Sequence, residues 1–192
     1  RGKISFELNL ETASHANHSG RSGGLIPNAA IEMVKLLSTM IDENNRVTIE
    51  GFYDDVTPPT EHELQLIDKI PFNPEGLAKV YGVKELKLSR KEFFLQMMFQ
   101  PTFTINGMSS GYTGKGGKTS VPGSAMVKID MRLVDNQDPT DIEEKIKKHI
   151  AKHNPDVKMS DISKMYPSKT QTDMPICKAV VEAARKFYNN AV

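Results

Sequence analysis

Apolar and polar residues alternate strictly over residues 3–10, so that one side of the segment carries only apolar side chains. Alternation with a period of two predicts a half-buried β-strand. One-sided patterns over residues 102–106, 125–133 and 157–162 predict three further strands. Because each predicted strand has a single apolar face, we expect helices to cover one side of an antiparallel sheet and leave the other side polar and open.

Two stretches between these strands predict helices. Pro27 suits the first turn of one helix, and Asp138 followed by Pro139 gives an N-cap and a first-turn proline for the other. The residues that we expect to face inward from the first helix are Met33, Val34, Leu37, Met40 and Ile41. The apolar stripe of the second helix is Ile142, Ile146 and Ile150.

The resulting order of elements is strand, helix, strand, strand, helix, strand, which is that of the ferredoxin-like split βαβ motif. We therefore predict an α+β fold, a two-layer sandwich with a four-stranded antiparallel sheet and two helices on one face. Residues 46–100 are less regular, with short helical patterns over residues 61–69 and 89–98, and we interpret them as an inserted segment. After Tyr166 a polar loop leads to a C-terminal helical pattern that opens at Asp173 and Pro175.

The composition narrows the class of protein. With 192 residues the chain has room for one good core, or for one domain and a fragment of another. Its 25 basic and 24 acidic residues leave a formal charge of +1, so we expect no nucleic acid and no membrane as partner. The single cysteine, Cys177, cannot form an internal disulfide, and no signal-like or membrane-spanning run is present, which favours the cytoplasm.

Two motifs resemble cofactor-binding sites, but the residues around them lack what such sites require. The stretch GYTGKGGKT at residues 111–119 lacks the first glycine of a phosphate-binding loop, and Pro122 follows where a helix should begin. His149 and His153 are four residues apart on a predicted helix, but no third ligand is near, and we expect a solvated helix end. We therefore predict no metal site in this chain and no catalysis by the chain alone.

Another histidine, His18, lies in the glycine-rich segment SHANHSGRSGGLIPNAA, directly after the first predicted strand. Such a segment is too rich in glycine to be buried, so an exposed surface histidine is one interpretation of His18. The same interpretation holds for the neighbouring His15.

Several segments, in order, resemble the lid domain of M20 metallopeptidases, especially carnosinases and cytosolic non-specific dipeptidases. They are RG at residues 1–2, HSGRSGG followed by PNA, GFYDDV, PTFTINGMSSGYTGKGGKTSVP and MRLVDNQDP, and they extend to residue 139. The resemblance implies a lid and dimerisation domain over residues 1–163, with the insertion at about residues 46–100. Residues 164–192 would then be a stub of the catalytic domain, which in this family holds two zinc ions, or similar divalent ions, through ligands that are absent here.

The resemblance also assigns roles to three residues. His18 matches a lid histidine that reaches the metal centre of the partner subunit and stabilises the oxyanion, and Asn28, ten positions later, supports His18 over His15. Thr119 matches a threonine that approaches the substrate from the partner subunit. Arg132 matches an arginine that binds the C-terminal carboxylate of the substrate, and its place on the polar face of a predicted strand suits that role. A surface salt bridge is the other interpretation of Arg132.

The implied parent enzyme is a homodimer that pairs through its lids and hydrolyses the amide bond of a peptide or N-acyl amino acid. The departures from the family pattern, SVP for VIP and Asp135 for proline, leave the substrate open. A different class of protein, a stand-alone interaction or oligomerisation module with the same fold, remains as the alternative. A nucleotide-binding domain is the third and least favoured interpretation.

Overall fold

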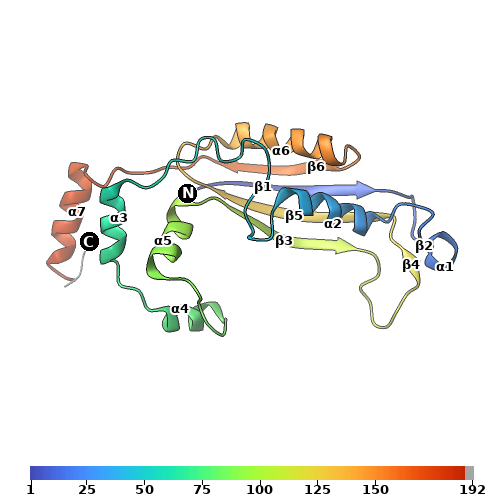
Figure 1. Ribbon diagram of the computed structural model, residues 1–192, viewed down its shortest axis with the longest axis horizontal. Helices are drawn as coiled ribbons and strands as arrows, with labels where there is room; N and C mark the ends of the chain where they lie inside the picture. The colour runs from blue at the N-terminus through green and yellow to red at the C-terminus, as the bar shows by residue number, and fades with distance from the viewer. Residues whose placement is uncertain (189–192) are drawn as a thin grey trace. The chain divides into compact units, whose positions relative to one another are not determined.

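The computed structural model describes residues 1–188, and Figure 1 shows its main sheet. The strands are β1 (Gly2–Glu11), β3 (Thr102–Ser110), β5 (Ser124–Leu133) and β6 (Lys158–Met165). All neighbouring strands are antiparallel, in the order β3-β5-β1-β6. Together with the helices below, this arrangement confirms the predicted α+β class with a four-stranded antiparallel sheet. A small second sheet pairs β2 (Asn17–His18) with β4 (Ser120–Val121).

The chain divides into two compact units. Unit 1 consists of residues Arg1–Asp55 and Pro101–Pro167, and contains both sheets. Unit 2 consists of residues Val56–Gln100 and the segment from Ser168 onward.

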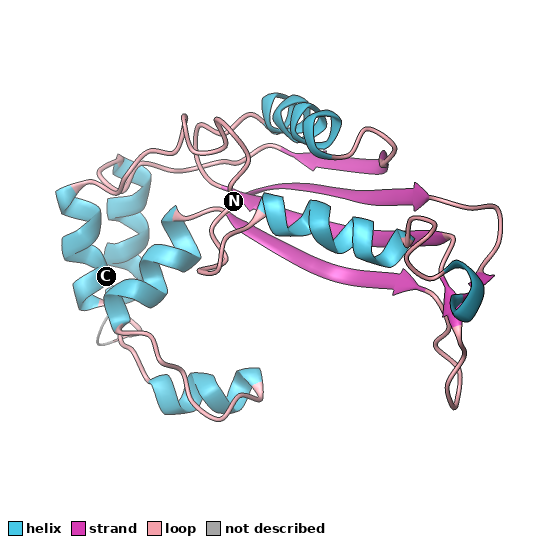
Figure 2. Cartoon of the chain, turned by 45° about the vertical axis from the view of Figure 1, so that its right-hand side comes forward, coloured by secondary structure: helices cyan, strands magenta, loops and turns pink. Residues whose placement is uncertain are grey.

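In unit 1, α2 (Ala29–Met40) and α6 (Pro139–His153) cover one face of the main sheet (Figure 2). The alternation of β1 explains this layering, because Leu8 is buried against Val127 of β5 while its neighbours in sequence point to the other face. Asn28 caps α2 through hydrogen bonds from the amides of Ala30 and Ile31, and Asp138 caps α6. The stripe of α6 predicted from the sequence is buried.

Two predicted orientations in this layer are wrong. Val34 of α2 is 53% exposed, and Leu36 is buried in its place, because the buried stripe of α2 is turned relative to the predicted one. His149 is buried rather than solvated, since it lies on the side of α6 that faces α2 and its Nε2 is 2.9 Å from Oγ1 of Thr39.

The loop after α2 belongs to the core of unit 1. Val47, Ile49 and Phe52 are buried in the cluster that fills the space between sheet and helices. Gln137 holds this loop from inside, because its Nε2 donates to the carbonyl oxygen of Phe52 at 2.8 Å while its Oε1 accepts from the amide of Val134 at 3.0 Å. A fully buried glutamine therefore has a partner at both ends of its amide.

Unit 2 contains α3 (Glu61–Lys69), α4 (Pro74–Tyr81), α5 (Arg90–Phe99) and α7 (Pro175–Arg185). Capping boxes begin both α3, at Thr60, and α5, at Ser89. Lys169, in the segment that returns to this unit, forms an ion pair of 2.7 Å with the buried Glu63 of α3. Among the described residues, no helix is long and apolar enough to cross a membrane.

Candidate functional site

The small β2–β4 sheet brings His18 and Thr119 together. His18 pairs with Ser120 in register, and the amide of Ser19 donates to the carbonyl oxygen of Thr119 at 3.2 Å. As a result, Nε2 of His18 is 3.3 Å from Oγ1 of Thr119, although 101 residues separate them in sequence. Both side chains are exposed, so they can meet a molecule that approaches from solvent. We call this pair the His18 site.

The local backbone orients the ring of His18. His18 is the N-cap of the short helix α1 (Ser19–Ser22), and its Nδ1 accepts from the amide of Gly20 at 3.1 Å. An amide can only donate, so the neutral ring carries its proton on Nε2. A Cβ atom at residue 20 would lie 3.0 Å from Cε1 of His18, and glycine therefore leaves the ring room to fold back over the helix. Nε2–H then donates to Oγ1 of Thr119 at 3.3 Å, on the exposed side of the site.

Close packing of the chain holds the same region. The amides of Thr12 and Ala13 both donate to the carbonyl oxygen of Gly123, at 2.8 and 3.2 Å. A Cβ atom at residue 123 would be 2.5 Å from the carbonyl oxygen of Ala13, so only glycine permits this approach. The segment that leads to His18 is thereby fixed against the segment that follows Thr119.

Arg132 lies elsewhere on unit 1, on the open face of the main sheet. Its Nε donates to Oδ1 of Asp130 at 3.0 Å, which is the salt bridge considered from the sequence, and its side chain is 47% exposed. Within residues 1–188, no hydrogen bond engages its two terminal nitrogens. Lys3 is its neighbour in register on β1. Burial, and to a lesser extent the positive charge of Arg132, lower the pKa of Arg1. Arg1, Lys3 and Arg132 together make this end of the sheet cationic.

The structure does not bring Arg132 to the His18 site of the same chain. Arg132 is near the end of β5, whereas β4 and His18 lie beyond its first residue, Ser124. Arg132 lies eight positions after Ser124 along the strand, which corresponds to about 26 Å at a rise of about 3.3 Å per residue. One small substrate therefore cannot contact both groups of one subunit.

The segment at residues 111–119 is an exposed loop that leads into β4 and not into a helix. It thus lacks the helix N-terminus that a phosphate-binding loop requires. The hydroxyl of Tyr112 donates to the carbonyl oxygen of Lys115 at 3.0 Å, and the ammonium of Lys118 lies over the ring of Tyr112. In the described part of the chain, no group of three or more His, Cys, Asp or Glu side chains could hold a metal ion.

Sequence reasoning selected His18, Thr119 and Arg132 but did not identify the amide of Gly20 that orients His18. The only sequence signal for that contact is the order His-Ser-Gly at a predicted loop, which is too common to single it out.

Comparisons with known proteins agree on one family. The family described as "Peptidase dimerisation domain" matches residues 1–158. Curated relatives include the Beta-Ala-His dipeptidase of Rattus norvegicus, 27% identical over 151 residues, and a Cys-Gly metallodipeptidase of Candida albicans, 28% identical over 151 residues. Each alignment covers 78% of this chain but 31% of the relative, so the chain spans about a third of the length of these proteins.

Solved structures with the same fold include an M20 peptidase and a carnosine dipeptidase. A M20 family metallo-carboxypeptidase from Sulfolobus solfataricus has a TM-score of 0.88 and 39% identity, over 98% of this chain and 50% of that one. Human carnosine dipeptidase 1 has a TM-score of 0.82 and 24% identity, over 100% of this chain and 42% of that one, which shows the shared fold.

Proposed function

Because the chain belongs to the family of M20 peptidase dimerisation domains, we propose that it is the lid of a zinc-dependent homodimeric peptidase and completes the active site of the partner subunit. The substrate is a peptide or N-acyl amino acid, and the enzyme works in the cytoplasm. The zinc ions are held by residues outside this chain, so the chain alone is inactive. The observation that carries the proposal is the placement of the His18 site and Arg132 at opposite ends of one sheet.

The edge strand β3 supports the association that this arrangement needs. Nine residues long and without a charged side chain, β3 exposes Met108 at 49% and Ile105 at 39%. Natural edge strands that must stay unpaired commonly carry charges or proline. An uncharged edge of this length is therefore suited to pair with a second copy of itself.

The exposed side of α2 adds an apolar surface to this edge. Ile31 and Val34 are each 53% exposed, and α2 packs chiefly over β5, the neighbour of β3. The apolar face of α2 and the free edge of β3 therefore lie on the same side of unit 1. In a two-fold dimer the same patch serves both subunits.

Antiparallel pairing of two β3 strands explains how the separated groups meet. It reverses the direction of the partner's sheet, so that the His18 end of one subunit lies beside the Arg132 end of the other. Arg132 then binds the carboxylate of a substrate with its free terminal nitrogens, a geometry suited to a planar guanidinium. His18 and Thr119 of the other subunit reach the scissile amide, where Nε2–H donates to the oxygen on which negative charge develops.

The catalytic part of the proposal is tested in the full-length enzyme with His18→Ala. Loss of one oxyanion donor should lower kcat by about 100- to 1,000-fold with metal content and dimer unchanged. His15→Ala is the matched control, because His15 is an exposed histidine of the same segment, and it should stay within a few-fold of wild type. A His18→Ala enzyme that retains its kcat would remove the assigned role.

Action across the dimer has its own test. Mixing His18→Ala subunits with subunits whose zinc ligands are substituted should restore activity, because one site of each heterodimer then combines intact zinc ligands with an intact His18. Absence of recovery, when heterodimers are shown to form, would place His18 at the active site of its own subunit.

The interface is tested with Met108→Lys on the edge strand β3. A charge there should shift the full-length enzyme toward the monomer in analytical ultracentrifugation. Met165→Lys is the matched control, since Met165 is 48% exposed on the opposite edge strand, β6. Equal dissociation by both substitutions would exclude pairing through β3.

A further inference from the structure

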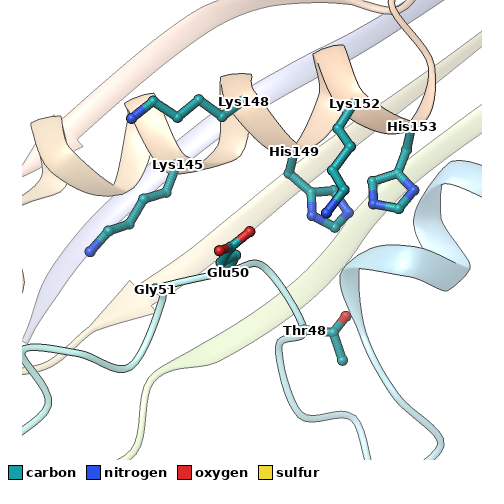
Figure 3. Close-up of a pocket in the computed structure, with 8 residues that line it drawn as sticks. All are labelled: Thr48, Glu50, Gly51, Lys145, Lys148, His149, Lys152 and His153. Carbon is teal, nitrogen blue, oxygen red and sulfur yellow. The ribbon is translucent and has the colours of Figure 1, made fainter.

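A hollow in unit 1, separate from the His18 site, is lined mainly by basic side chains. It has a volume of about 400 Å³ and lies between α6 and the loop that follows α2. Figure 3 shows its side chains, which include Lys148, His149, Lys152 and His153 from the helix and Thr48 and Glu50 from the loop. We call this hollow the α6 pocket. It shares no residue with the His18 site.

Two of the lysines in this pocket have no counter-ion among residues 1–188. Lys145, at its margin, forms an ion pair of 2.6 Å with Asp141, and the adjacent Lys147 forms one of 2.6 Å with Glu143. Within the described residues, Lys148 and Lys152 make neither an ion pair nor a hydrogen bond through their side chains. The helix thus neutralises two of its lysines and leaves these two available to a ligand.

Fewer acidic than basic side chains line the pocket. Glu50 is the one carboxylate among the lining residues, and it has no ion pair in the described part of the chain. Lys148 and Lys152 outweigh it by one charge when His149 is neutral and by two when His149 is protonated. Lys145 adds little, because Asp141 already balances it.

The hydrogen bonds of His149 direct its second proton toward a ligand. The hydroxyl of Thr39 donates to the carbonyl oxygen of Leu36 at 2.7 Å, so it accepts from Nε2–H of His149. Nδ1 is then the nitrogen that remains to be protonated. The ring of His153 lies beside that of His149, with 4.3 Å between their centroids, and both rings line the pocket.

The surroundings of His149 disfavour its protonated form in the absence of an anion. Burial, then the positive charges of His153 and Lys152, lower its pKa. The charged groups that line the pocket are Lys145, Lys148 and Lys152 from α6 and Glu50 from the loop, with Asp141 and Asp55 beside Lys145. On α2, which packs against α6, Glu32 and Lys35 neutralise each other at 2.8 Å.

We propose that the α6 pocket binds a tetrahedral oxyanion of the phosphate type, and that binding is coupled to proton uptake by His149. Such an anion offers several acceptors to ammonium and imidazolium groups, and these charge-assisted hydrogen bonds are stronger than neutral ones. The volume is within the usual range of small-ligand sites. The site is independent of the proposed peptidase function, since none of its residues takes part in that function.

The first experiment titrates sulfate into the full chain at constant ionic strength and at pH 6.0 and 7.5, with binding followed by calorimetry. Sulfate keeps its charge over this range, so a change in affinity reports the protein alone. We expect saturable binding at one site, at least tenfold tighter at pH 6.0. Absence of saturable binding at pH 6.0, or equal affinity at both values, would overturn the proposal.

Variants separate a built site from general attraction to a basic surface. Lys148→Gln/Lys152→Gln should weaken binding at least tenfold, and Glu50→Gln should tighten it. The control, Lys84→Gln/Lys158→Gln, removes the same charge from two exposed lysines outside the pocket and should change affinity less than twofold. Equal loss in the two double variants would refute the site.

Two further measurements define the coupling and the ligand. His149→Gln should remove most of the dependence on pH while sulfate still binds through Lys148 and Lys152, and an unchanged dependence would contradict the assignment of His149. Inorganic phosphate and phenyl phosphate should both compete with sulfate. Tighter binding of the ester would indicate a phosphorylated metabolite as the ligand, and tighter binding of inorganic phosphate would indicate the free ion. Failure of both to compete would overturn the assignment to phosphate.

Discussion

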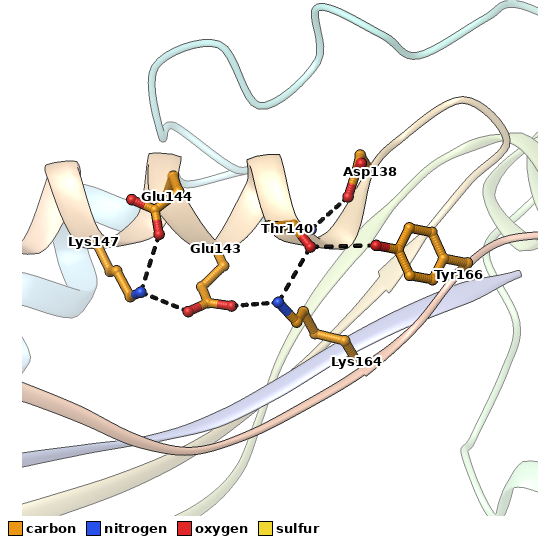
Figure 4. Close-up of polar contacts among 7 residues, drawn as sticks. All are labelled: Asp138, Thr140, Glu143, Glu144, Lys147, Lys164 and Tyr166. Carbon is orange, nitrogen blue, oxygen red and sulfur yellow. Dashed lines mark hydrogen bonds and ion pairs between the residues drawn. The ribbon is translucent and has the colours of Figure 1, made fainter.

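Replacing Glu143 by glutamine should destabilise unit 1, because this carboxylate joins α6 to β6. Figure 4 shows Glu143 between two lysines, with 2.6 Å from its Oε1 to Nζ of Lys147 and 2.8 Å from its Oε2 to Nζ of Lys164. Its side chain is 11% exposed, whereas those of Lys147 and Lys164 are 45% and 32% exposed. Lys164 also donates to Oγ1 of Thr140 at 3.2 Å, which lies within reach of the Tyr166 hydroxyl.

The magnitude follows from the two charge-assisted hydrogen bonds. Each such bond contributes about 1.5–3 kcal/mol when its partners are well buried. Solvent screens the partly exposed lysines here, so we expect a total loss of about 1.5–3 kcal/mol for Glu143→Gln at pH 7. Glu144→Gln is the control, because Glu144 contacts the same Lys147 at 3.0 Å but is 56% exposed, and it should cost less than about 0.5 kcal/mol.

The stability that Glu143 contributes should decrease as pH falls. The two lysines lower the pKa of Glu143 below that of an ordinary glutamate. A lowered carboxyl pKa contributes stability that is complete above the unfolded value, about 4.3, and is lost as pH falls through the folded value. In urea unfolding followed by circular dichroism, the curves of wild type and Glu143→Gln should therefore converge between pH 5 and pH 3. Equal losses for Glu143→Gln and Glu144→Gln at pH 7, or a difference that persists in acid, would refute this reasoning.

Three further outcomes are expected. The lowered pKa of His149 means that the unfolded chain binds protons more readily, so in buffer without phosphate or sulfate the free energy of unfolding should fall as pH drops below about 6.5, and His149→Gln should lose most of this change. Asn28→Ala should cost about 1 kcal/mol in urea unfolding through loss of the α2 cap, and Asn28→Ser should restore most of it. Lys169→Met leaves the buried Glu63 without its ammonium partner and should increase amide exchange in α3, whereas Glu63→Gln/Lys169→Met should recover part of the protection.

The sequence predicted the elements of unit 1 well because its strands and helices carry strong periodicity. Alternation placed β1 and β5 within one residue of their observed ends, and the Asp138-Pro139 pair placed the start of α6. The helix α4 was not predicted, although Asn73 and Gly82 cap its ends, since eight residues give too short a pattern to recognise.

The missed features depend on contacts distant in sequence. His149 is buried because α2 packs on the same side of α6, which the composition of α6 alone cannot indicate. Likewise, no spacing predicts that His18 meets Thr119, because β2 and β4 are only two residues long and pair across a hundred residues of chain. The resemblance to the family indicated His18 and Thr119 separately, and only the structure shows that they are in contact.

The separation of Arg132 from His18 along β5 has a consequence for how such an enzyme behaves on dilution. If each active site needs a hydrogen-bond donor from the partner subunit, an isolated protomer has no complete active site. Turnover per milligram should then decline once the protein is diluted below the dissociation constant of the pair and recover on concentration, so that assembly itself sets the amount of working enzyme.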